Sequence, residues 1–366
     1  SAARATTSLR GAIVADLYPS LTDEQCIERI KEIKDKEGDK LVILGHHYQR
    51  QDIISVSDII GDSFELSRKA AALNNALTIA FCGVHFMAES AFLLAPPGRS
   101  VYLPDIDAGC PMADMAEISQ VEKAWQQLEE TLGEEPAIPL VYMNSSAAIK
   151  AFCGKHGGAV CTSSNAQKVL KWAFEKGKRV LFLPDEHLGR NTANDMGIVG
   201  DEVVLWRPYS EKGGVEKEAL EKSRLILWKG FCIVHQNFTV DDVKRVRSEH
   251  PKAKIYVHPE CKEEVVKLSD GNGSTSYLVK VAAEAPTDSE VCIGTEVHLV
   301  DRLTAQMSDK KVFPLRRSEC ANMAKITPKK LLHTLETLDE NKIVTVKAEY
   351  QENARLALQR MLDICS

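Results

Sequence analysis

The sequence contains no CxxC pair, no zinc-finger spacing, and no Gly-x-Gly-x-x-Gly motif after a strand-like run. The first two absences argue against a zinc finger, and the third gives dinucleotide binding little support. No apolar run approaches the roughly 18 residues of a membrane span. The opening stretch, SAARATTSLRG, has no hydrophobic signal core, so secretion is not expected.

Neither sign of charge dominates, because the net charge is only −6 over 366 residues. So mild a balance argues against bulk binding to nucleic acid or anionic membranes, although a local basic pocket stays open. A content of 44% hydrophobic and 27% charged residues is typical of a globular protein with two or three domains. We expect a soluble cytoplasmic protein with no nucleic-acid or membrane partner.

Ten cysteines are present, and without a signal sequence they are expected to be reduced thiols, mostly small core residues. Cys82 and Cys292 lie inside strand patterns and are assigned no role. Three others close three matched segments: Cys110 ends VYLPDIDAGC, Cys232 lies in LILWKGFC, and Cys320 ends KVFPLRRSEC. These three are the candidate metal ligands.

Short β-rich runs alternate with helical patterns throughout the chain. The runs are apolar on both faces, as in parallel sheets that are covered by helices, so the pattern predicts an α/β fold. The expected strands lie at 41–47, 76–83, 100–105, 139–146, 159–164, 179–185, 225–230, 254–260, 290–295 and 311–315.

The same order of features recurs three times. A strand runs into a polar cluster (LVILGHHY, PLVYMNSS, IYVHPE), a hydroxyl residue opens a helix, a second strand ends in a polar turn, and a cysteine follows. Any α/β protein contains strand–Ser–helix units, but this full order predicts internal triplication, with one metal centre on a pseudo-threefold axis. The middle segment is longer, and its excess is expected to be a surface insertion at 200–223.

The predicted domains follow these segments. They are 1–115 with an N-terminal extension, 116–235, 236–325, and a C-terminal helical segment at 326–366. Strand ends and helix N-termini would meet at one edge of each sheet, where free N–H groups favour phosphate and carboxylate. Ser63, Ser163 and Thr275 are therefore candidate contacts to an acidic small molecule, with plain helix capping as the alternative.

Three pairs of polar residues share one face of an extended chain: His46 with Tyr48, Tyr142 with Asn144, and His258 with Glu260. Histidine beside tyrosine suits proton transfer and carbonyl polarisation, and Glu260 is a candidate general acid or base. The alternatives are backbone-satisfying residues at a strand end and a solvated surface glutamate. Three thiolates on a cubane iron–sulfur cluster would leave one iron open for chemistry; zinc is the alternative metal.

Specific motifs across residues 40–335 resemble the quinolinate synthase family of de novo NAD synthesis. They are ILGHHYQ, GDSFELSR, FCGVHFMAE, DAGCPMADM, VYMNSSAAIKA, CTSSNA, FLPDEHLGRN, LWKGFCIVH, VHPEC, GSTS, IGTE and ECANMAKIT. The resemblance implies three homologous αβα-sandwich domains around a central active-site cleft. It also implies a [4Fe–4S] cluster on Cys110, Cys232 and Cys320 with one open iron.

The implied reaction condenses iminoaspartate with dihydroxyacetone phosphate to quinolinate, and an aspartate-oxidising enzyme is a possible functional link. By resemblance, Tyr48 and Glu260 transfer protons, whereas His46 and Tyr142 orient or polarise the substrate. The residues implied to hold carboxylate and phosphate oxygens are Ser63, Asn144, Ser163, His258 and Thr275.

This sequence departs from some relatives, which carry a CxxCxxC near the C-terminus where only Cys320 stands here. The match to Ser163 could instead fall on Ser164. Met323 would pack near the cluster or serve as plain core. Two other functions stay open at this point: an iron–sulfur hydro-lyase acting on a hydroxy acid, and a non-catalytic iron–sulfur sensor.

Overall fold

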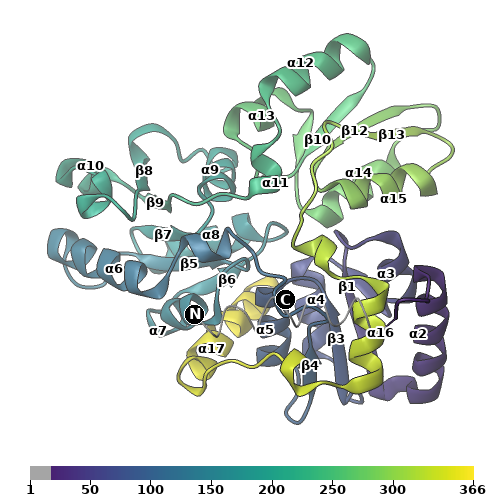
Figure 1. Ribbon diagram of the computed structural model, residues 1–366. Helices are drawn as coiled ribbons and strands as arrows, with labels where there is room; N and C mark the ends of the chain where they lie inside the picture. Colours follow the sequence, from purple (N-terminus) through teal and green to yellow (C-terminus); the bar gives the residue numbers. More distant parts are fainter. Residues whose placement is uncertain (1–17) are drawn as a thin grey trace. The chain divides into compact units, whose positions relative to one another are not determined.

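A computed structural model describes residues 18–366, and it contains three separate parallel β-sheets (Figure 1). The opening stretch SAARATTSLRG and most of the predicted N-terminal extension lie outside these residues. Each sheet falls within one of the three predicted segments, and helices follow nearly every strand. The predicted α/β class with parallel sheets is therefore confirmed.

The first sheet has the strand order β2-β1-β3-β4. Its strands are β1 (Leu41–His46), β2 (Ile59–Gly61), β3 (Thr78–Cys82) and β4 (Ser100–Tyr102). The helices in this part of the chain are α2 (Asp23–Glu37), α3 (Gln51–Val56), α4 (Ser63–Ala71) and α5 (His85–Leu94). Strand β1 is buried at five of its six positions, which explains its apolar sequence on both faces.

The second sheet has five strands in the order β6-β5-β7-β9-β8. They are β5 (Ile138–Tyr142), β6 (Ala159–Cys161), β7 (Val180–Leu183), β8 (Val203–Trp206) and β9 (Leu225–Trp228). The accompanying helices are α6 (Ile118–Leu132), α7 (Ala147–Lys155), α8 (Ala166–Lys176), α9 (Glu186–Asp195) and α10 (Lys217–Lys222).

The third sheet has the order β11-β10-β12-β13. Its strands are β10 (Lys254–Val257), β11 (Gly271–Asn272), β12 (Glu290–Gly294) and β13 (Lys311–Pro314). The helices are α11 (Ile233–Gln236), α12 (Val240–Glu249), α13 (Glu263–Leu268), α14 (Thr275–Glu284) and α15 (Val297–Gln306). A core that includes Phe238, Val246 and Leu315 packs with strand residues Ile255 and Cys292.

All three sheets place their strands in the same order: the second strand of the segment, then the first, the third and the last. The middle sheet differs only by β8, which pairs in parallel with β9 at the edge. Strand β8 lies in the predicted insertion at 200–223, so this insertion extends the sheet by one edge strand. The shared order supports the internal triplication read from the sequence.

The chain divides into two compact units. The first consists of residues 18–61, 65–109 and 321–345, and it holds the first sheet. The second consists of Asp62–Phe64, Cys110–Cys320 and Val346–Ser366, and it holds the other two sheets. The finer division into three domains at 115, 235 and 325 stays a prediction.

The last segment is helical, with α16 (Pro328–Thr337) and α17 (Ala348–Cys365). Helix α17 packs closely against α7, where Gly154 makes the approach possible (Figure 1). A Cβ atom on Gly154 would lie 1.9 Å from the carbonyl oxygen of Asn353. Arg360 Nη1 reinforces this contact by donating to the carbonyls of Gly154 and Gly158 at 2.9 and 2.8 Å. Among the described helices, none combines the length and the apolar character needed to cross a membrane.

Candidate active site

Glu260 lies at the centre of a buried polar cluster in the second unit, three residues after β10 ends. The residue is only 3% exposed. His235 Nδ1 lies 2.6 Å from Glu260 Oε2, and the Tyr142 hydroxyl at the end of β5 also hydrogen-bonds this carboxylate. Burial alone would raise the pKa of Glu260, but His258, His235 and the two hydrogen bonds outweigh it and lower the pKa to about 2. Glu260 is therefore an ionised carboxylate at neutral pH.

His258 is held as a neutral ring with a defined tautomer. The backbone N–H of Glu260 donates to His258 Nδ1 at 3.2 Å, so the proton of the neutral ring lies on Nε2. That nitrogen lies 3.2 Å from Ser163 Oγ. Burial is the main reason why the pKa of His258 falls from 6.5 to about 3, with Glu260 opposing the shift. His258 therefore donates a hydrogen bond to Ser163 and is not an ion-pair partner at neutral pH.

The loop that carries Glu260 is clamped by side-chain amides. Asn191 Nδ2, on α9, donates to the carbonyls of Pro259 and Cys261, each at 2.8 Å. Gln236 Nε2 donates to the carbonyl of Glu260 at 3.3 Å. Three successive carbonyl groups are thus paired, and this holds the Glu260 backbone in one geometry, as a positioned catalytic group requires.

His46 and Tyr48 repeat this geometry in the first unit. The backbone N–H of Tyr48 donates to His46 Nδ1 at 3.1 Å, just as Glu260 donates to His258. The two rings meet edge to face with centroids 4.7 Å apart. Strand β1 ends at His46, so Tyr48 approaches His46 through a turn and not through the extended alternation that the sequence suggested.

The three candidate cysteine ligands all lie in the second unit and are all half-buried. Burial raises the pKa of Cys110 to about 12, with Cys320 and Glu260 adding to the rise. Burial likewise raises the pKa of Cys232 well above its usual value, and Glu260 and Cys110 contribute. Cys110 therefore lies within electrostatic reach of Cys232, Cys320 and Glu260, and Cys232 lies within reach of Glu260.

His235 joins the cysteine group to Glu260. Its Nδ1 lies 3.2 Å from Cys232 Sγ as well as 2.6 Å from Glu260, and its Nε2 lies 3.0 Å from Thr295 Oγ1. The ring also stacks on His258, with centroids 4.5 Å apart. Ligand atoms of Cys232, His235 and Glu260 lie within 4.8 Å of one another, close enough to hold a metal ion. Near the third cysteine, the backbone N–H of Cys320 donates to Glu296 at 3.1 Å.

Ser63 and Thr275 do not supply the capping acceptors of their own helices. At α4 the capping acceptor is Asp62, whose Oδ1 accepts from the N–H of Phe64 at 3.1 Å. At α14 it is Ser274, whose Oγ accepts from Tyr277 at 3.2 Å. The capping role is therefore taken by these neighbours of Ser63 and Thr275. Ser163 contacts His258, whereas Ser164 donates to Asp62 at 2.6 Å, which favours Ser163 as the residue that faces the site.

Two further buried groups lie at the strand ends of the second sheet. Asn144 Oδ1 is buried and has no hydrogen-bond partner among the described residues, which suits an acceptor for a ligand or a water. Burial, and next the charge of Glu260, raise the pKa of Asp185 well above its usual value. Its Oδ1 caps α9 through the N–H of His187 at 2.8 Å, while Oδ2 is buried without a partner. Burial and the neighbouring Glu260 therefore both disfavour the ionised form of Asp185.

The structure brings together Tyr142, Ser163, His258 and Glu260, and it places Cys110, Cys232 and Cys320 in the same unit. Sequence reasoning missed His235, Asn191 and Asp62, although each stands in a motif quoted above: LWKGFCIVH, FLPDEHLGRN and GDSFELSR. Met323 belongs to the first unit, where it is 4% exposed and accepts from Gln49 through its carbonyl at 3.2 Å.

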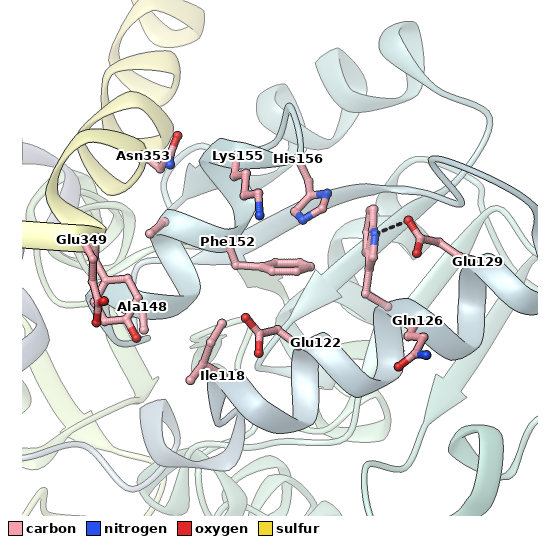
Figure 2. A pocket seen from close by; sticks show the side chains of 13 residues that line it. Ile118, Glu122, Gln126, Glu129, Ala148, Phe152, Lys155, His156, Glu349 and Asn353 are labelled. Atoms are coloured by element: carbon pink, nitrogen blue, oxygen red, sulfur yellow. Dashed lines mark hydrogen bonds between the residues drawn. The ribbon is translucent and has the colours of Figure 1, made fainter.

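A hollow of about 450 Å³ lies elsewhere in the second unit, between α6, α7 and α17 (Figure 2). Trp125 packs against Phe152 and His156, with ring centroids 5.3 and 4.6 Å away, and Trp125 Nε1 donates to Glu129 at 2.9 Å. None of the predicted site residues lines this hollow. The polar chemistry gathers at the strand ends and not among these helices.

Comparison with known proteins agrees with the geometry. Residues 28–363 match the family described as Quinolinate synthetase A protein. A quinolinate synthase from Corynebacterium glutamicum is 47% identical over 360 residues, which cover 97% of this chain and 91% of the relative. One from Bacillus cereus strain Q1 is 46% identical over 356 residues, covering 96% of each. This chain therefore belongs to the quinolinate synthase family.

Proposed function

We propose that this enzyme makes quinolinate from iminoaspartate and dihydroxyacetone phosphate, with release of phosphate and two waters. Quinolinate synthase activity follows from family membership over nearly the whole chain. The atoms of the two substrates, hydrogen and oxygen included, equal those of quinolinate, phosphate and two waters. The reaction therefore needs no external oxidant or reductant. The chemistry therefore consists of condensation and dehydration, which depend on proton transfers and on the binding of anionic groups.

Cys110, Cys232 and Cys320 are proposed to hold a [4Fe–4S] cluster. The donor set fits this group, because three half-buried thiols share one unit and none of them forms a disulfide. Burial and neighbouring negative charge raise the pKa of Cys110 and Cys232, so both need bound positive charge to become thiolates. When bound by three cysteines, such a cluster supplies one iron that can act as a Lewis acid toward a substrate oxygen.

Glu260 is the proposed proton acceptor. It is ionised, clamped through its backbone, and able to pass a proton along its hydrogen bond to His235. The Tyr142 hydroxyl, which hydrogen-bonds Glu260, would polarise or orient the substrate at the same edge. Tyr48 is proposed as a second proton carrier, with His46 as its orienting neighbour. The buried ionised Glu260 is the observation that most strongly supports this assignment of roles.

The remaining polar groups are proposed to hold substrate oxygens. Ser163 is oriented by the Nε2–H of His258, and Asn144 has a buried acceptor without a protein partner. Ser63 and Thr275 are the first residues of α4 and α14, where the free N–H groups of a helix start favour anions. The residues proposed for this role are Ser63, Asn144, Ser163, His258 and Thr275.

The chemistry of the nitrogen substrate also points to a supplier. An imine such as iminoaspartate hydrolyses in water, so an enzyme that oxidises aspartate must deliver it freshly made. We propose that both enzymes work in the cytoplasm and that their link is functional. Adding an aspartate-oxidising enzyme and aspartate should therefore sustain quinolinate formation, whereas oxaloacetate with no ammonia present should not.

The test of the function is quinolinate formation by anaerobically purified protein. We expect product only when dihydroxyacetone phosphate and freshly generated iminoaspartate are both present, and we expect it to disappear after exposure to air. No product from a sample with a full complement of iron and sulfide would contradict the proposed reaction. Turnover of a hydroxy acid by that sample would then favour a hydro-lyase.

A further inference from the structure

Three helix starts in the second unit converge on one carboxylate, Asp62. Its Oδ2 accepts hydrogen bonds from Ser164 Oγ at 2.6 Å and from Ser276 Oγ at 2.7 Å. Its Oδ1 accepts from the backbone N–H of Phe64 at 3.1 Å. One oxygen therefore caps its own helix, α4, while the other ties the starts of α8 and α14 to it.

Asp62, Ser164 and Ser276 together form a hydrogen-bonded hub. Each of them is the sequence neighbour of one of the three proposed anion contacts. Asp62 precedes Ser63, Ser164 follows Ser163, and Ser276 follows Thr275. Because adjacent residues share a rigid peptide plane, holding one member of each pair restricts where the backbone of the other can lie. The hub thus links three short segments that lie far apart in the sequence, one in each predicted repeat.

The acceptor of these hydrogen bonds is buried, which strengthens them. Asp62 is 5% exposed, whereas Ser276 is half-buried and Ser164 is exposed. Hydrogen bonds to a charged acceptor are shorter and stronger than those between neutral groups, and the two hydroxyl distances agree with this. Asp62 also acts electrostatically on His258, which contacts Ser163.

We propose that Asp62 is a positioning residue, which holds Ser63, Ser163 and Thr275 in register so that their hydroxyl groups converge on the anionic groups of the substrate. Asp62 does not touch the substrate in this account. The inference rests on the proposed roles of the three hydroxyl residues, so its test includes variants of those residues as well.

Asp62 carries a negative charge near a proposed anion site. The direction in which Asp62→Asn changes anion affinity therefore distinguishes electrostatic repulsion from positioning. Electrostatics alone predicts that Asp62→Asn tightens anion binding, because a repelling charge is removed. Loss of positioning predicts the opposite, because an amide nitrogen in place of Oδ2 cannot accept from two serine hydroxyls. The two explanations therefore differ in direction and not only in size.

The experiment measures the Kd of anaerobic holoenzyme for quinolinate and for inorganic phosphate by calorimetry. We expect Asp62→Asn to weaken both by about 10- to 100-fold, the loss typical of hydrogen bonds to a charged group. The double variant Ser164→Ala/Ser276→Ala should weaken binding to a similar extent. Adding Asp62→Asn to it should cost little more, because the same contacts are already gone.

A matched control is Asp270→Asn in the third repeat. Asp270 also accepts three donors, from the backbone of Ile255 at 2.8 Å, from Arg247 at 2.7 Å and from Lys254 at 3.2 Å. Its loss should lower the Tm and leave both Kd values unchanged. A steady-state comparison should show Asp62→Asn raising KM for dihydroxyacetone phosphate more than it lowers kcat, with cluster content unchanged.

Unchanged or tighter anion binding by Asp62→Asn would overturn the proposal. Should Asp62→Asn fail to fold, unchanged Kd values for Ser164→Ala/Ser276→Ala would overturn it equally. Three further variants separate the proposed anion contacts from the proposed positioning by the hub: Ser63→Ala, Ser163→Ala and Thr275→Val. If these weaken binding while the hub variants do not, only the hub is wrong; if they have no effect either, the proposed anion contacts fail and the hub falls with them.

Discussion

Each of the three sheets has one cysteine inside a strand and one in the loop after its last strand. The strand cysteines are Cys82 in β3, Cys161 in β6 and Cys292 in β12, and all are fully buried. Cys110, Cys232 and Cys320 follow the carboxyl ends of the sheets and are half-buried. Each sheet therefore has one cysteine in a strand and one in the loop that follows its last strand, so the same side chain can be compared in two environments.

The difference between the two settings lies in the neighbours. Cys292 belongs to an apolar core cluster, and burial is the first cause that raises its pKa to about 12. Cys232 instead has His235 at 3.2 Å and shares an electrostatic environment with Cys110 and Glu260. A cysteine that belongs to a strand is buried even at the last position of the strand, as Cys82 and Cys161 are. A cysteine in the loop beyond the last strand lies at the edge where parallel sheets bind ligands.

The largest effect is expected from replacing the loop cysteines. Cys110→Ala, Cys232→Ala and Cys320→Ala should each abolish quinolinate formation and cluster retention, because a cluster held by two thiolates is exposed to loss. Cys82→Ala and Cys292→Ala should keep both and cost about 1–2 kcal/mol of stability through a small cavity. Iron and sulfide analysis together with the quinolinate assay measures this, and full cluster in all three loop variants would sink the ligand assignment.

The next comparison sets Glu260 against Glu290. Both are close to a histidine, but Glu290 lies at the amino end of β12, where His250 Nδ1 is 3.0 Å away. Glu260→Gln should keep the cluster and lower kcat by about 10²- to 10⁴-fold, since a proton acceptor is removed. Glu290→Gln should leave kcat unchanged. Normal turnover by Glu260→Gln would remove this residue from the mechanism.

A smaller effect is expected at the end of β5. Tyr142→Phe keeps the ring but removes a hydrogen bond from the ionised Glu260, which should cost about 1.5–3 kcal/mol of stability and about tenfold in kcat. Tyr256→Phe, inside β10, is the matched variant and should change neither. Urea unfolding at pH 7 and steady-state kinetics decide between them; equal behaviour of the two variants would contradict the role of the Tyr142 hydroxyl.

A further effect, small per pH unit and spread over several units, concerns stability and pH. The pKa of His258 is lowered from 6.5 to about 3, so between these values the unfolded chain binds a proton that the folded chain does not. The free energy of unfolding should therefore decrease as pH falls through this window, by up to about 1.4 kcal/mol per pH unit. His258→Gln should flatten that slope, and an unchanged slope in denaturant titrations from pH 7 to 4 would show that His258 is charged in the folded protein.

The strands were predictable to the extent that they depend on local pattern, whereas their order in each sheet was not predicted. The runs that became β1, β5 and β10 are apolar on both faces and end in polar residues, and this recurring order indicated three parallel sheets. Strands β2 and β11, with three and two residues, are too short to carry a distinct pattern. Strand β8 is a four-residue apolar run, VVLW, and the polar residues on both sides of it concealed it in the sequence.

The site was predictable where residues stand two apart in the chain, as His258 and Glu260 do. It was not predictable where the contact joins distant segments. Asp62 meets Ser276 across 214 residues, and His235 meets Thr295 across 60, so neither contact has a signal within its own segment. The sequence also does not distinguish Ser163 from Ser164, because only the fold shows which hydroxyl donates to Asp62; the assignment of Ser163 to the substrate stays a prediction.

The central claim is that three loop cysteines hold four irons and leave one of them to the substrate. Mössbauer spectroscopy of the iron-57 holoenzyme, with and without quinolinate, tests it most directly. The account predicts that about one quarter of the iron signal changes on adding quinolinate, and that Cys292→Ala behaves in the same way. A spectrum of a single-iron site, or four irons that ignore the ligand, would contradict it.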